Sequence, residues 1–402
     1  MSRRTLPLTL AALGAVGTLA LVSCSSGSSS GSSPTPTDAG VTSASAASSS
    51  DCSSDGSDPA ADPAAASFDL QAPTAGPNGE TAVSANDITL TPEEIAQVKE
   101  KGLTAVMPWA GSGPWYDALT KGASDQFAEM GVDVGSVTSA EFDAAKQTND
   151  IESDMSQNPD IILTLPVDPA VISQALKPAA EKGKVIVFAD NGVEGFSAGK
   201  DYVGITTGDH FGMGKAAASL MSDAVGGDGQ IGIIYHDADF YVTNNRDHSF
   251  EAAIVQDYPC LQIVARQGFA EESATGDIAS AMLAQNPDLK GIYVAWDTAA
   301  ESVLEAIRAA GRNDVKVVTY DLGATNDMEM AKGGLLYGTV VDKPYQIGQT
   351  MAKLAAYKIL GKEAPPFVTV DLIAVTKDNL ADAWQESLQE DIPSELAAQL
   401  GQ

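Results

Sequence analysis

Polar side chains follow several of the short apolar runs in this 402-residue sequence, at positions where they can hold a polar ligand. The set comprises Asp168, Asp190, Asn191, Trp296, Asp297 and Asp321. Carboxylates accept hydrogen bonds, amides donate and accept them, and hydrogen bonds to a charged group are the stronger kind. The pattern therefore predicts a site that binds through directed hydrogen bonds.

Two of these aspartates have a second interpretation. Asp168 and Asp297 precede predicted helices, where an aspartate often caps the first turn. Asp190 and Asp321 end predicted strands and have no obvious capping role. They are therefore the stronger candidates for ligand binding.

The elements that must position these residues alternate along the chain. Apolar runs of strand length occupy residues 103–107, 132–137, 161–165, 185–189, 231–235, 261–264, 291–295 and 315–320, with helical patterns between them. Such alternation predicts βαβ units and parallel sheets. Folded structure should begin near Thr91-Pro92-Glu93-Glu94, which has the form of a helix start. Because ligands of parallel sheets bind outside the carboxyl ends of the strands, we expect the polar residues to line one cleft.

One unit of the chain occurs twice. Asn158-Pro159-Asp160 precedes a strand, a helix and a strand that ends at Asp190, and Asn286-Pro287-Asp288 precedes the same order of elements, ending at Asp321. A folded region of about 300 residues is also larger than a domain with a single hydrophobic core usually is. The repeat predicts two similar α/β lobes.

The start of the chain has the pattern of a lipoprotein signal peptide. Two arginines precede an apolar run, and Leu21-Val22-Ser23 precedes Cys24, the predicted lipidated first residue of the mature chain. A transmembrane helix over residues 5–22 is the alternative, but the cysteine motif disfavours it. We expect a signal peptide over residues 1–23 and an extracytoplasmic protein that is lipid-anchored to the cell membrane.

The segment after Cys24 is low in apolar residues. Residues 24–86 are dominated by Ser, Ala, Gly, Pro and Asp, so we expect a disordered tether. Cys52 lies in this segment, and Cys260 lies beside an apolar run. A bridge between these two cysteines is one interpretation, but a buried free thiol is the expectation for Cys260.

The charge balance excludes one class of partner. The chain has 54 acidic and 23 basic residues, for a net charge of −31. Nucleic-acid binding requires clustered Lys and Arg that face phosphate. We therefore expect no nucleic acid partner.

The order of these motifs resembles that of type I periplasmic binding proteins of the ribose and galactose group, which serve ABC importers. Over residues 100–380 the markers are Gly113-Pro114-Trp115-Tyr116, Lys121-Gly122-Ala123, Asn149-Asp150-Ile151-Glu152, Pro166-Val167-Asp168-Pro169, Asp190-Asn191, residues 246–250, Trp296-Asp297, Tyr320-Asp321 and Pro344-Tyr345-Gln346-Ile347-Gly348. The resemblance implies two Rossmann-like lobes, joined by a three-strand hinge that closes on a ligand. It also implies a monomer whose partner is an ABC permease.

By this resemblance the binding domain covers residues 87–380. Lobe 1 would comprise residues 100–206 and 343–371, and lobe 2 residues 207–342 and 372–379, with crossings near Thr207, Asp342 and Asp371. Residues 381–402 form a C-terminal tail, with a predicted helix over residues 381–389 and no assigned role.

The resemblance also implies site residues, and the ligand-binding set is Trp115, Tyr116, Asp190, Asn191, Asn244, Arg246, Trp296, Asp297, Asp321 and Asp342. In sugar-binding relatives two consecutive aromatics stack on the ring, and they fall here on Trp115 and Tyr116. Asn244, Asn245 and Arg246 are the candidates for a contact with hydroxyls, with a purely structural role as the alternative for Arg246. Asp321 matches a carboxylate that accepts hydroxyl hydrogen bonds. The implied ligand is a sugar or polyol, because its CH faces suit aromatics and its hydroxyls suit carboxylates.

The site departs from the ribose pattern in ways that leave the ligand open. Asp190-Asn191 stands where relatives have Asn or Asp followed by Arg, Trp296-Asp297 stands where they have Asn-Asp, and Leu165 occupies a position that often carries Asn. A more acidic and aromatic pocket also suits a cationic or quaternary ammonium ligand. A ligand-sensing receptor of a signalling system is a further alternative.

Patterns for catalysis or metal binding are weak. Residues 195–199 read Gly-Phe-Ser-Ala-Gly but do not lie on a strand-to-helix turn, and residues 212–216 lack groups that a phosphate loop requires. His210, His236 and His248 do not have metal-ligand spacing. We expect no enzyme activity, no cofactor and no metal.

Overall fold

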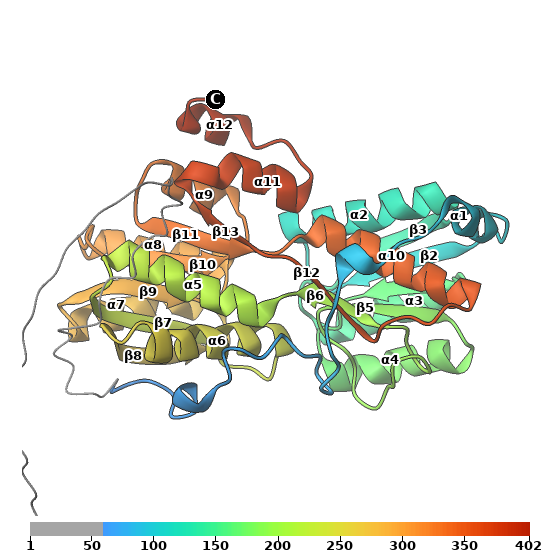
Figure 1. Ribbon diagram of the computed structural model, residues 1–402, viewed down its shortest axis with the longest axis horizontal. Helices are drawn as coiled ribbons and strands as arrows, with labels where there is room; N and C mark the ends of the chain where they lie inside the picture. The colour runs from blue at the N-terminus through green and yellow to red at the C-terminus, as the bar shows by residue number, and fades with distance from the viewer. Residues whose placement is uncertain (1–58) are drawn as a thin grey trace, which may run out of the picture. The chain divides into compact units, whose positions relative to one another are not determined.

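The fold is built on two β-sheets, each flanked by helices (Figure 1). The computed structural model describes residues 59–402. The first sheet has the order β1-β12-β6-β5-β4-β2-β3 and the second the order β13-β11-β10-β9-β7-β8. The strands are β1 (Val83–Ser84), β2 (Thr104–Trp109), β3 (Asp133–Ser139), β4 (Ile161–Thr164), β5 (Val185–Ala189), β6 (Ile205–Gly208), β7 (Gly229–His236), β8 (Leu261–Phe269), β9 (Leu289–Val294), β10 (Lys316–Tyr320), β11 (Leu336–Val341), β12 (Phe367–Val370) and β13 (Ile373–Thr376). We call the first sheet with its helices lobe 1 and the second with its helices lobe 2.

All paired strands are parallel except β11 and β13, which are antiparallel. Central strands such as β4 are buried along their whole length, because helices cover both faces of a parallel sheet. The predicted α/β class with two Rossmann-like lobes is confirmed.

The helices are α1 (Pro92–Lys99), α2 (Pro114–Met130), α3 (Ala144–Ser156), α4 (Pro169–Glu181), α5 (His210–Val225), α6 (Tyr241–Asp257), α7 (Thr275–Gln285), α8 (Asp297–Ala309), α9 (Ala324–Ala331), α10 (Pro344–Leu360), α11 (Leu380–Leu388) and α12 (Ser394–Leu400), with short 3-10 turns η1 (Ala65–Ser67), η2 (Ala85–Asp87), η3 (Glu272–Ala274) and η4 (Lys377–Asn379). Local chemistry sets several helix starts. Thr91 and Glu94 form a capping box at α1. Asp168 accepts hydrogen bonds from the backbone N–H groups of Ala170 and Val171, so its role is to cap α4.

Helices α2 and α10 pack closely within lobe 1. A Cβ at Gly122 would lie 1.9 Å from the Tyr345 carbonyl oxygen, and a Cβ at Gly348 would lie 2.0 Å from that of Leu119. Only glycine permits this approach of two helix backbones. The contact anchors α10, the helix that brings the chain back from lobe 2, onto α2.

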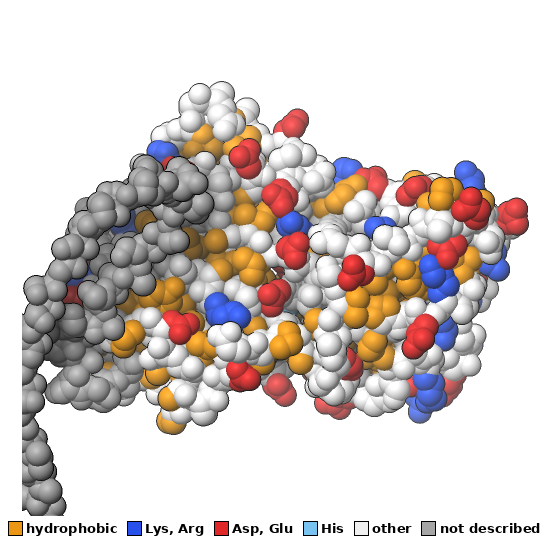
Figure 2. All heavy atoms as spheres, in the orientation of Figure 1, with side chains coloured by type: hydrophobic (Ala, Val, Ile, Leu, Met, Phe, Trp, Pro, Cys, Tyr) orange, Lys and Arg blue, Asp and Glu red, His pale blue; other side chains and the backbone are white. Residues whose placement is uncertain are grey.

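From β6 onward the chain passes between the two sheets three times, and these three passages form the hinge. It leaves lobe 1 after Gly208 of β6, leaves lobe 2 after Val341 of β11, and leaves lobe 1 again after Val370 of β12. Side chains that follow these strands therefore lie between the lobes. Figure 2 shows acidic side chains over both lobes and at their junction, as the net charge of −31 requires.

Residues 59–84, which we call the strap, pack against the two lobes. The backbone N–H of Ala60 donates to the Ile263 carbonyl of β8, and Lys215 of α5 donates to the Leu70 carbonyl. Leu70 is buried in the core of lobe 2. The expectation of a disordered tether through residue 86 is wrong for residues 59–86, because a few apolar side chains and many backbone hydrogen bonds hold them. The predicted signal peptide, Cys24 and Cys52 lie outside the described residues.

Cys260 corrects a second expectation. It is disulfide-bonded rather than a free thiol, and its partner is not among residues 59–402. The residue lies directly before β8, at the edge of the lobe 2 sheet.

The C-terminal residues belong to the fold. Trp384 and Leu388 of α11 and Leu396 of α12 are buried in the core of lobe 2. Ser387 donates a hydrogen bond of 2.7 Å to the Asp342 carbonyl in the hinge, and Lys343 forms an ion pair of 2.6 Å with Glu386. The C-terminal tail, to which the sequence assigned no role, therefore packs on lobe 2 and contacts the hinge.

Candidate ligand-binding site

Asp190 and Asp321 occupy equivalent positions at the carboxyl ends of β5 and β10. Both have left-handed backbone, with φ of 56° and 67°. This conformation is unfavourable for most side chains and clusters at functional sites. The repeated unit of the sequence thus places one carboxylate at the same strand end, with the same left-handed backbone, in each lobe.

Arg246 of α6 faces Asp321. Its Nη1 lies 3.7 Å from Asp321 Oδ2, and its guanidinium lies 4.5 Å from the centre of the Tyr320 ring. The Arg246 side chain is only 7% exposed, and its Nε has no hydrogen-bond partner among the described residues. A buried donor without a partner is costly, so this N–H is available to a ligand.

Asp190 lies at the end of a short chain of hydrogen bonds. Thr207 Oγ1 donates to Asp190 Oδ1 over 2.6 Å and lies 2.6 Å from His210 Nε2. Since the hydroxyl has one proton, His210 must donate from Nε2, and its Nδ1 is then an acceptor. Burial and the charge of Arg246 lower the pKa of His210, so the ring is neutral. The sequence analysis missed Thr207 and His210 as support for Asp190.

Asp342 links the hinge to lobe 1. Its Oδ1 accepts a hydrogen bond of 2.9 Å from Trp115 Nε1, and the Trp115 ring lies edge-on to Tyr116 at 5.0 Å. Burial, and then the charges of Asp190 and Asp321, raise the pKa of Tyr116. Tyr116 therefore lies within reach of the charges of both strand-end carboxylates, and Trp115 connects it to Asp342.

The site has more acidic groups than one guanidinium can neutralise. Burial raises the pKa of Asp190 to about 6, although the Thr207 hydrogen bond and Arg246 oppose the shift. Burial, with Asp321 and Asp190 nearby, raises the pKa of Asp342 to about 8. Burial also raises the pKa of Asp321, against the attraction of Arg246. At neutral pH the site therefore holds at least one proton in place of a cation.

Further hydrogen-bonding groups beside Asp190 are unpaired. Within the described part of the chain, neither the oxygen nor the nitrogen of the Asn191 side chain has a partner, and Asn191 is 2% exposed. Thr206 Oγ1 and His210 Nδ1 are also unpaired. Because native proteins satisfy nearly all buried polar groups, these atoms indicate a place for a polar ligand.

The structure brings most of the predicted residues together. Contacts and charge interactions connect Trp115, Tyr116, Asp190, Arg246, Asp321 and Asp342, and Asn191 adjoins Asp190. Asp297 interacts with Asp321, and burial followed by this repulsion raises its pKa to about 8. It occupies the first turn of α8 after Trp296 rather than the N-cap position, so its alternative structural role as a cap is wrong.

Asn244 and Trp296 lie elsewhere in lobe 2. Trp296 Nε1 donates to Glu272 Oε1, and its ring packs against His236 and Phe269 at 4.9 and 4.8 Å. Asn244 lines a separate cavity of about 340 Å³. Neither side chain forms a hydrogen bond or ion pair with Asp190 or Asp321.

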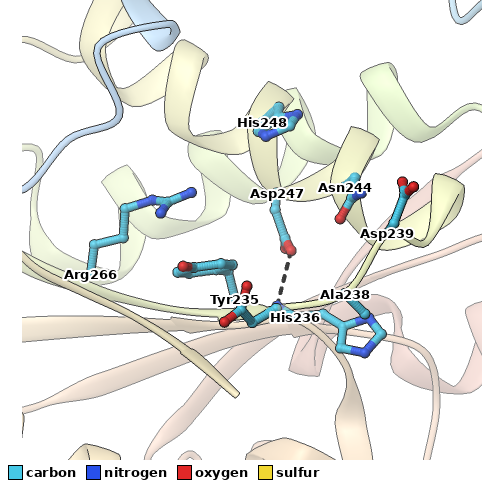
Figure 3. Close-up of a pocket in the computed structure, with 9 residues that line it drawn as sticks. Tyr235, His236, Ala238, Asp239, Asn244, Asp247, His248 and Arg266 are labelled. Carbon is cyan, nitrogen blue, oxygen red and sulfur yellow. Dashed lines mark hydrogen bonds between the residues drawn. The ribbon is translucent and has the colours of Figure 1, made fainter. Parts of the chain in front are cut away.

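That cavity lies between the first half of α6 and the ends of β7 and β8 (Figure 3). Two of its charged groups already have partners: Asp247 accepts from Tyr293 and from the His236 backbone, and Arg266 pairs with Glu251 over 3.0 Å. The figure shows Arg266 and Tyr235 at one end and Asn244 and Asp239 at the other. Unlike the Asp190 and Asp321 cluster, the cavity has no lining residue with a polar side-chain atom that is both buried and unpaired.

Neither a metal-ligand cluster nor a membrane-spanning helix occurs within residues 59–402. No group of three or more His, Cys, Asp or Glu side chains in this part of the chain is arranged to hold a metal ion. No helix within it has the length and apolar character required to cross a membrane.

Comparison with known proteins identifies the family. A model described as a periplasmic binding protein domain matches residues 104–363. The chain belongs to the periplasmic binding protein family. The match contains the whole Asp190, Arg246, Asp321 and Asp342 cluster, whereas the strap and the C-terminal helices lie outside it.

Individual relatives agree with this family. The ribose import binding protein of Bacillus subtilis is 26% identical over 262 residues, which cover 65% of this chain and 83% of that protein. The D-allose-binding periplasmic protein of Escherichia coli is 26% identical, covering 66% of this chain and 89% of that protein. A solute-binding protein from Agrobacterium vitis, solved with alpha-D-tagatopyranose, has a TM-score of 0.63 at 22% identity, covers 69% of this chain and 96% of its own, and supports the fold.

Proposed function

We propose that this protein is an extracytoplasmic solute-binding lipoprotein that captures a sugar or polyol between its lobes and delivers it to an ABC importer. One observation carries the proposal. The strand ends of the two lobes face each other, so that the charges of Arg246 and Asp321 in lobe 2 act on Asp190 in lobe 1. Unpaired polar atoms of Asn191 and Arg246 lie in this same cluster.

The chemistry of the cluster suits a polyhydroxylated molecule. Carboxylates of Asp190 and Asp321 accept hydrogen bonds from hydroxyls, and Arg246 Nε and the Asn191 amide donate to hydroxyl oxygens. Trp115 and Tyr116 offer apolar surface to the CH groups of a ring. Exclusion of water by the lobes strengthens each of these hydrogen bonds.

The comparisons support a neutral carbohydrate over the cationic ligand considered above. The named relatives bind ribose or allose, and the first of them is an import protein. Family membership places the binding domain outside the cytoplasm. The lipid anchor at Cys24, the ABC permease and the monomeric state are parts of the proposal that rest on the sequence.

A thermal-shift screen of the purified protein tests the ligand class. The panel contains D-ribose, D-allose, D-tagatose, D-arabinose, xylitol and myo-inositol, with choline as a cation. A ligand at about 1,000 times its Kd adds about 4 kcal/mol to the free energy of unfolding. We expect a shift with at least one sugar or polyol and none with choline; a shift with choline alone overturns the carbohydrate assignment.

A pair of matched variants tests the site. Asp321→Asn removes the charge that faces Arg246, whereas Asp168→Asn replaces one good N-cap residue with another outside the cluster. We expect Asp321→Asn to lose the ligand-induced shift and Asp168→Asn to keep it. An unchanged shift in Asp321→Asn would show that the ligand binds elsewhere.

A further inference from the structure

The strap contacts lobe 2 along its first half. In addition to Ala60 and Leu70, it receives hydrogen bonds from Gln256 of α6, whose Nε2 donates to the Ala65 carbonyl over 2.8 Å. The Phe68 ring lies edge-on to Phe211 at 5.0 Å. Figure 1 shows this segment running along lobe 2 toward the junction of the lobes.

At the hinge the strap braces the start of α5. Thr74 is 2% exposed. Its hydroxyl donates to Asp209 Oδ1 over 2.5 Å, and Thr74 Oγ1 accepts from the Phe211 backbone N–H over 2.9 Å. Asp209 itself caps α5 by accepting from the Gly212 N–H. These bonds fix the first turn of α5, which contains His210, directly after the chain enters lobe 2.

Beyond the hinge the strap joins lobe 1. Ala75 and Thr81 form an antiparallel bridge across a tight turn, and Val83 and Ser84 then pair with Val368 and Thr369 of β12. The strap thereby adds β1 to the edge of the lobe 1 sheet. A Cβ at Gly76 would lie 3.0 Å from the Phe367 ring, so the turn packs directly on β12.

Tyr241 is where the strap and both lobes meet. It begins α6 of lobe 2, and its hydroxyl donates to the Ala75 carbonyl over 2.5 Å. Its ring lies edge-on to Phe367 of lobe 1 at 6.2 Å and to His210 at 5.9 Å. His210 is hydrogen-bonded to Thr207, and Thr207 is hydrogen-bonded to Asp190. The strap therefore supports the side chains that position one ligand-binding carboxylate.

We propose that the strap is a latch. It connects the lobes beside the three hinge passages, favours the lobe arrangement seen here, and positions Tyr241 and His210 behind Asp190. Because a ligand that binds one lobe arrangement binds more weakly when that arrangement is less populated, the latch also sets ligand affinity. The strap lies outside residues 104–363, so this control is separate from the family-matched domain.

The latch is tested in the ligand-free protein, so the result does not depend on the identity of the ligand. Tyr241→Phe removes one hydroxyl, and Thr74→Val removes another at constant shape. Tyr258→Phe, at the other end of α6, is the matched control. Small-angle X-ray scattering reports lobe separation, hydrogen exchange of residues 70–84 reports strap attachment, and thermal unfolding confirms that each variant is folded.

We expect Tyr241→Phe and Thr74→Val to increase both the radius of gyration and the exchange of residues 70–84, with Tyr258→Phe unchanged. Once a ligand is found, the same two variants should weaken its Kd by about threefold to tenfold, as loss of one hydrogen bond predicts. Faster exchange without a change in scattering, or no change in either, overturns the latch. In that case the strap would only cover the surface.

Discussion

The protonation of Asp342 is the first consequence of the crowded acidic cluster. Its pKa of about 8 exceeds the ordinary value, so the folded protein binds a proton that the unfolded chain releases between about pH 4 and pH 8. Stability should therefore fall as the pH rises through this window. The sign is opposite to that of an aspartate in a favourable ion pair, whose folded pKa is depressed.

Asp342→Asn keeps the shape of the side chain without the ionisation. We expect it to raise the Tm at pH 8 by about 2–5 °C and to change it little at pH 4. Calorimetry at both pH values measures the difference, with Asp168→Asn as the control. Equal effects of Asp342→Asn at the two pH values would show that this carboxyl does not titrate in the window.

Asn191 separates binding from stability. Its side-chain oxygen and nitrogen are buried and unpaired among the described residues, so they form no hydrogen bond that stabilises the fold before a ligand arrives. Asn191→Ala should leave the Tm within about 1 °C of wild type and weaken ligand binding about tenfold or more, because two hydrogen bonds are lost. Titration calorimetry with the first sugar from the screen measures the second effect. A large loss of Tm instead would make Asn191 a structural residue.

The direction in which the Asn244 side chain points could not be predicted from residue type alone. Residues two apart on a helix point to nearly opposite sides, so Asn244 and Arg246 of α6 cannot both face the cluster. The sequence offered them as alternative candidates for a hydroxyl contact and could not choose between them, because the phase of α6 depends on packing against the sheet. The support of Asp190 by Thr207 and His210 was not predicted for a similar reason, because only the tertiary fold places these residues beside Asp190.

At the scale of elements, the close packing of α2 on α10 sets a strict requirement. The Cβ of Gly122→Ala would meet the Tyr345 backbone at 1.9 Å, which cannot rotate away as a side chain would. We expect this variant to lose about 3 kcal/mol or more of stability, or to fail to fold. Gly135→Ala in β3 is the control, since its Cβ would lie 3.5 Å from the nearest atom, which is an ordinary van der Waals contact. Equal Tm values for the two variants would contradict a backbone clash.

The elements that sequence could predict are those with their own periodic signal. The apolar runs that became β2, β4, β5, β9 and β10 are continuous, as buried parallel strands require. The two residues of β1 have no such signal, because they form a strand only through their pairing with β12 at the hinge. The strap was predicted to be disordered for the same reason: its composition is that of a tether, and its order comes from contacts with distant residues such as Glu251 and Asp209.

At the scale of the whole molecule, the prediction of a lipid anchor connects the binding domain to a membrane. Cys24→Ser should block lipidation and move the protein from the membrane fraction to the soluble fraction. Immunoblots of fractionated cells measure this, and metabolic labelling with a fatty acid shows whether Cys24 is the acceptor. A variant that still sediments with membranes would show that another part of the chain holds it there.

The left-handed backbone at Asp190 and Asp321 also restricts how this site can evolve. Glycine, asparagine and aspartate adopt that conformation at low cost, whereas other side chains add strain. Few residue types can therefore replace these two aspartates when the protein evolves to bind a new ligand. Diversification within a lineage should instead accumulate at neighbours whose backbone is not left-handed, such as Asn191 and Trp115.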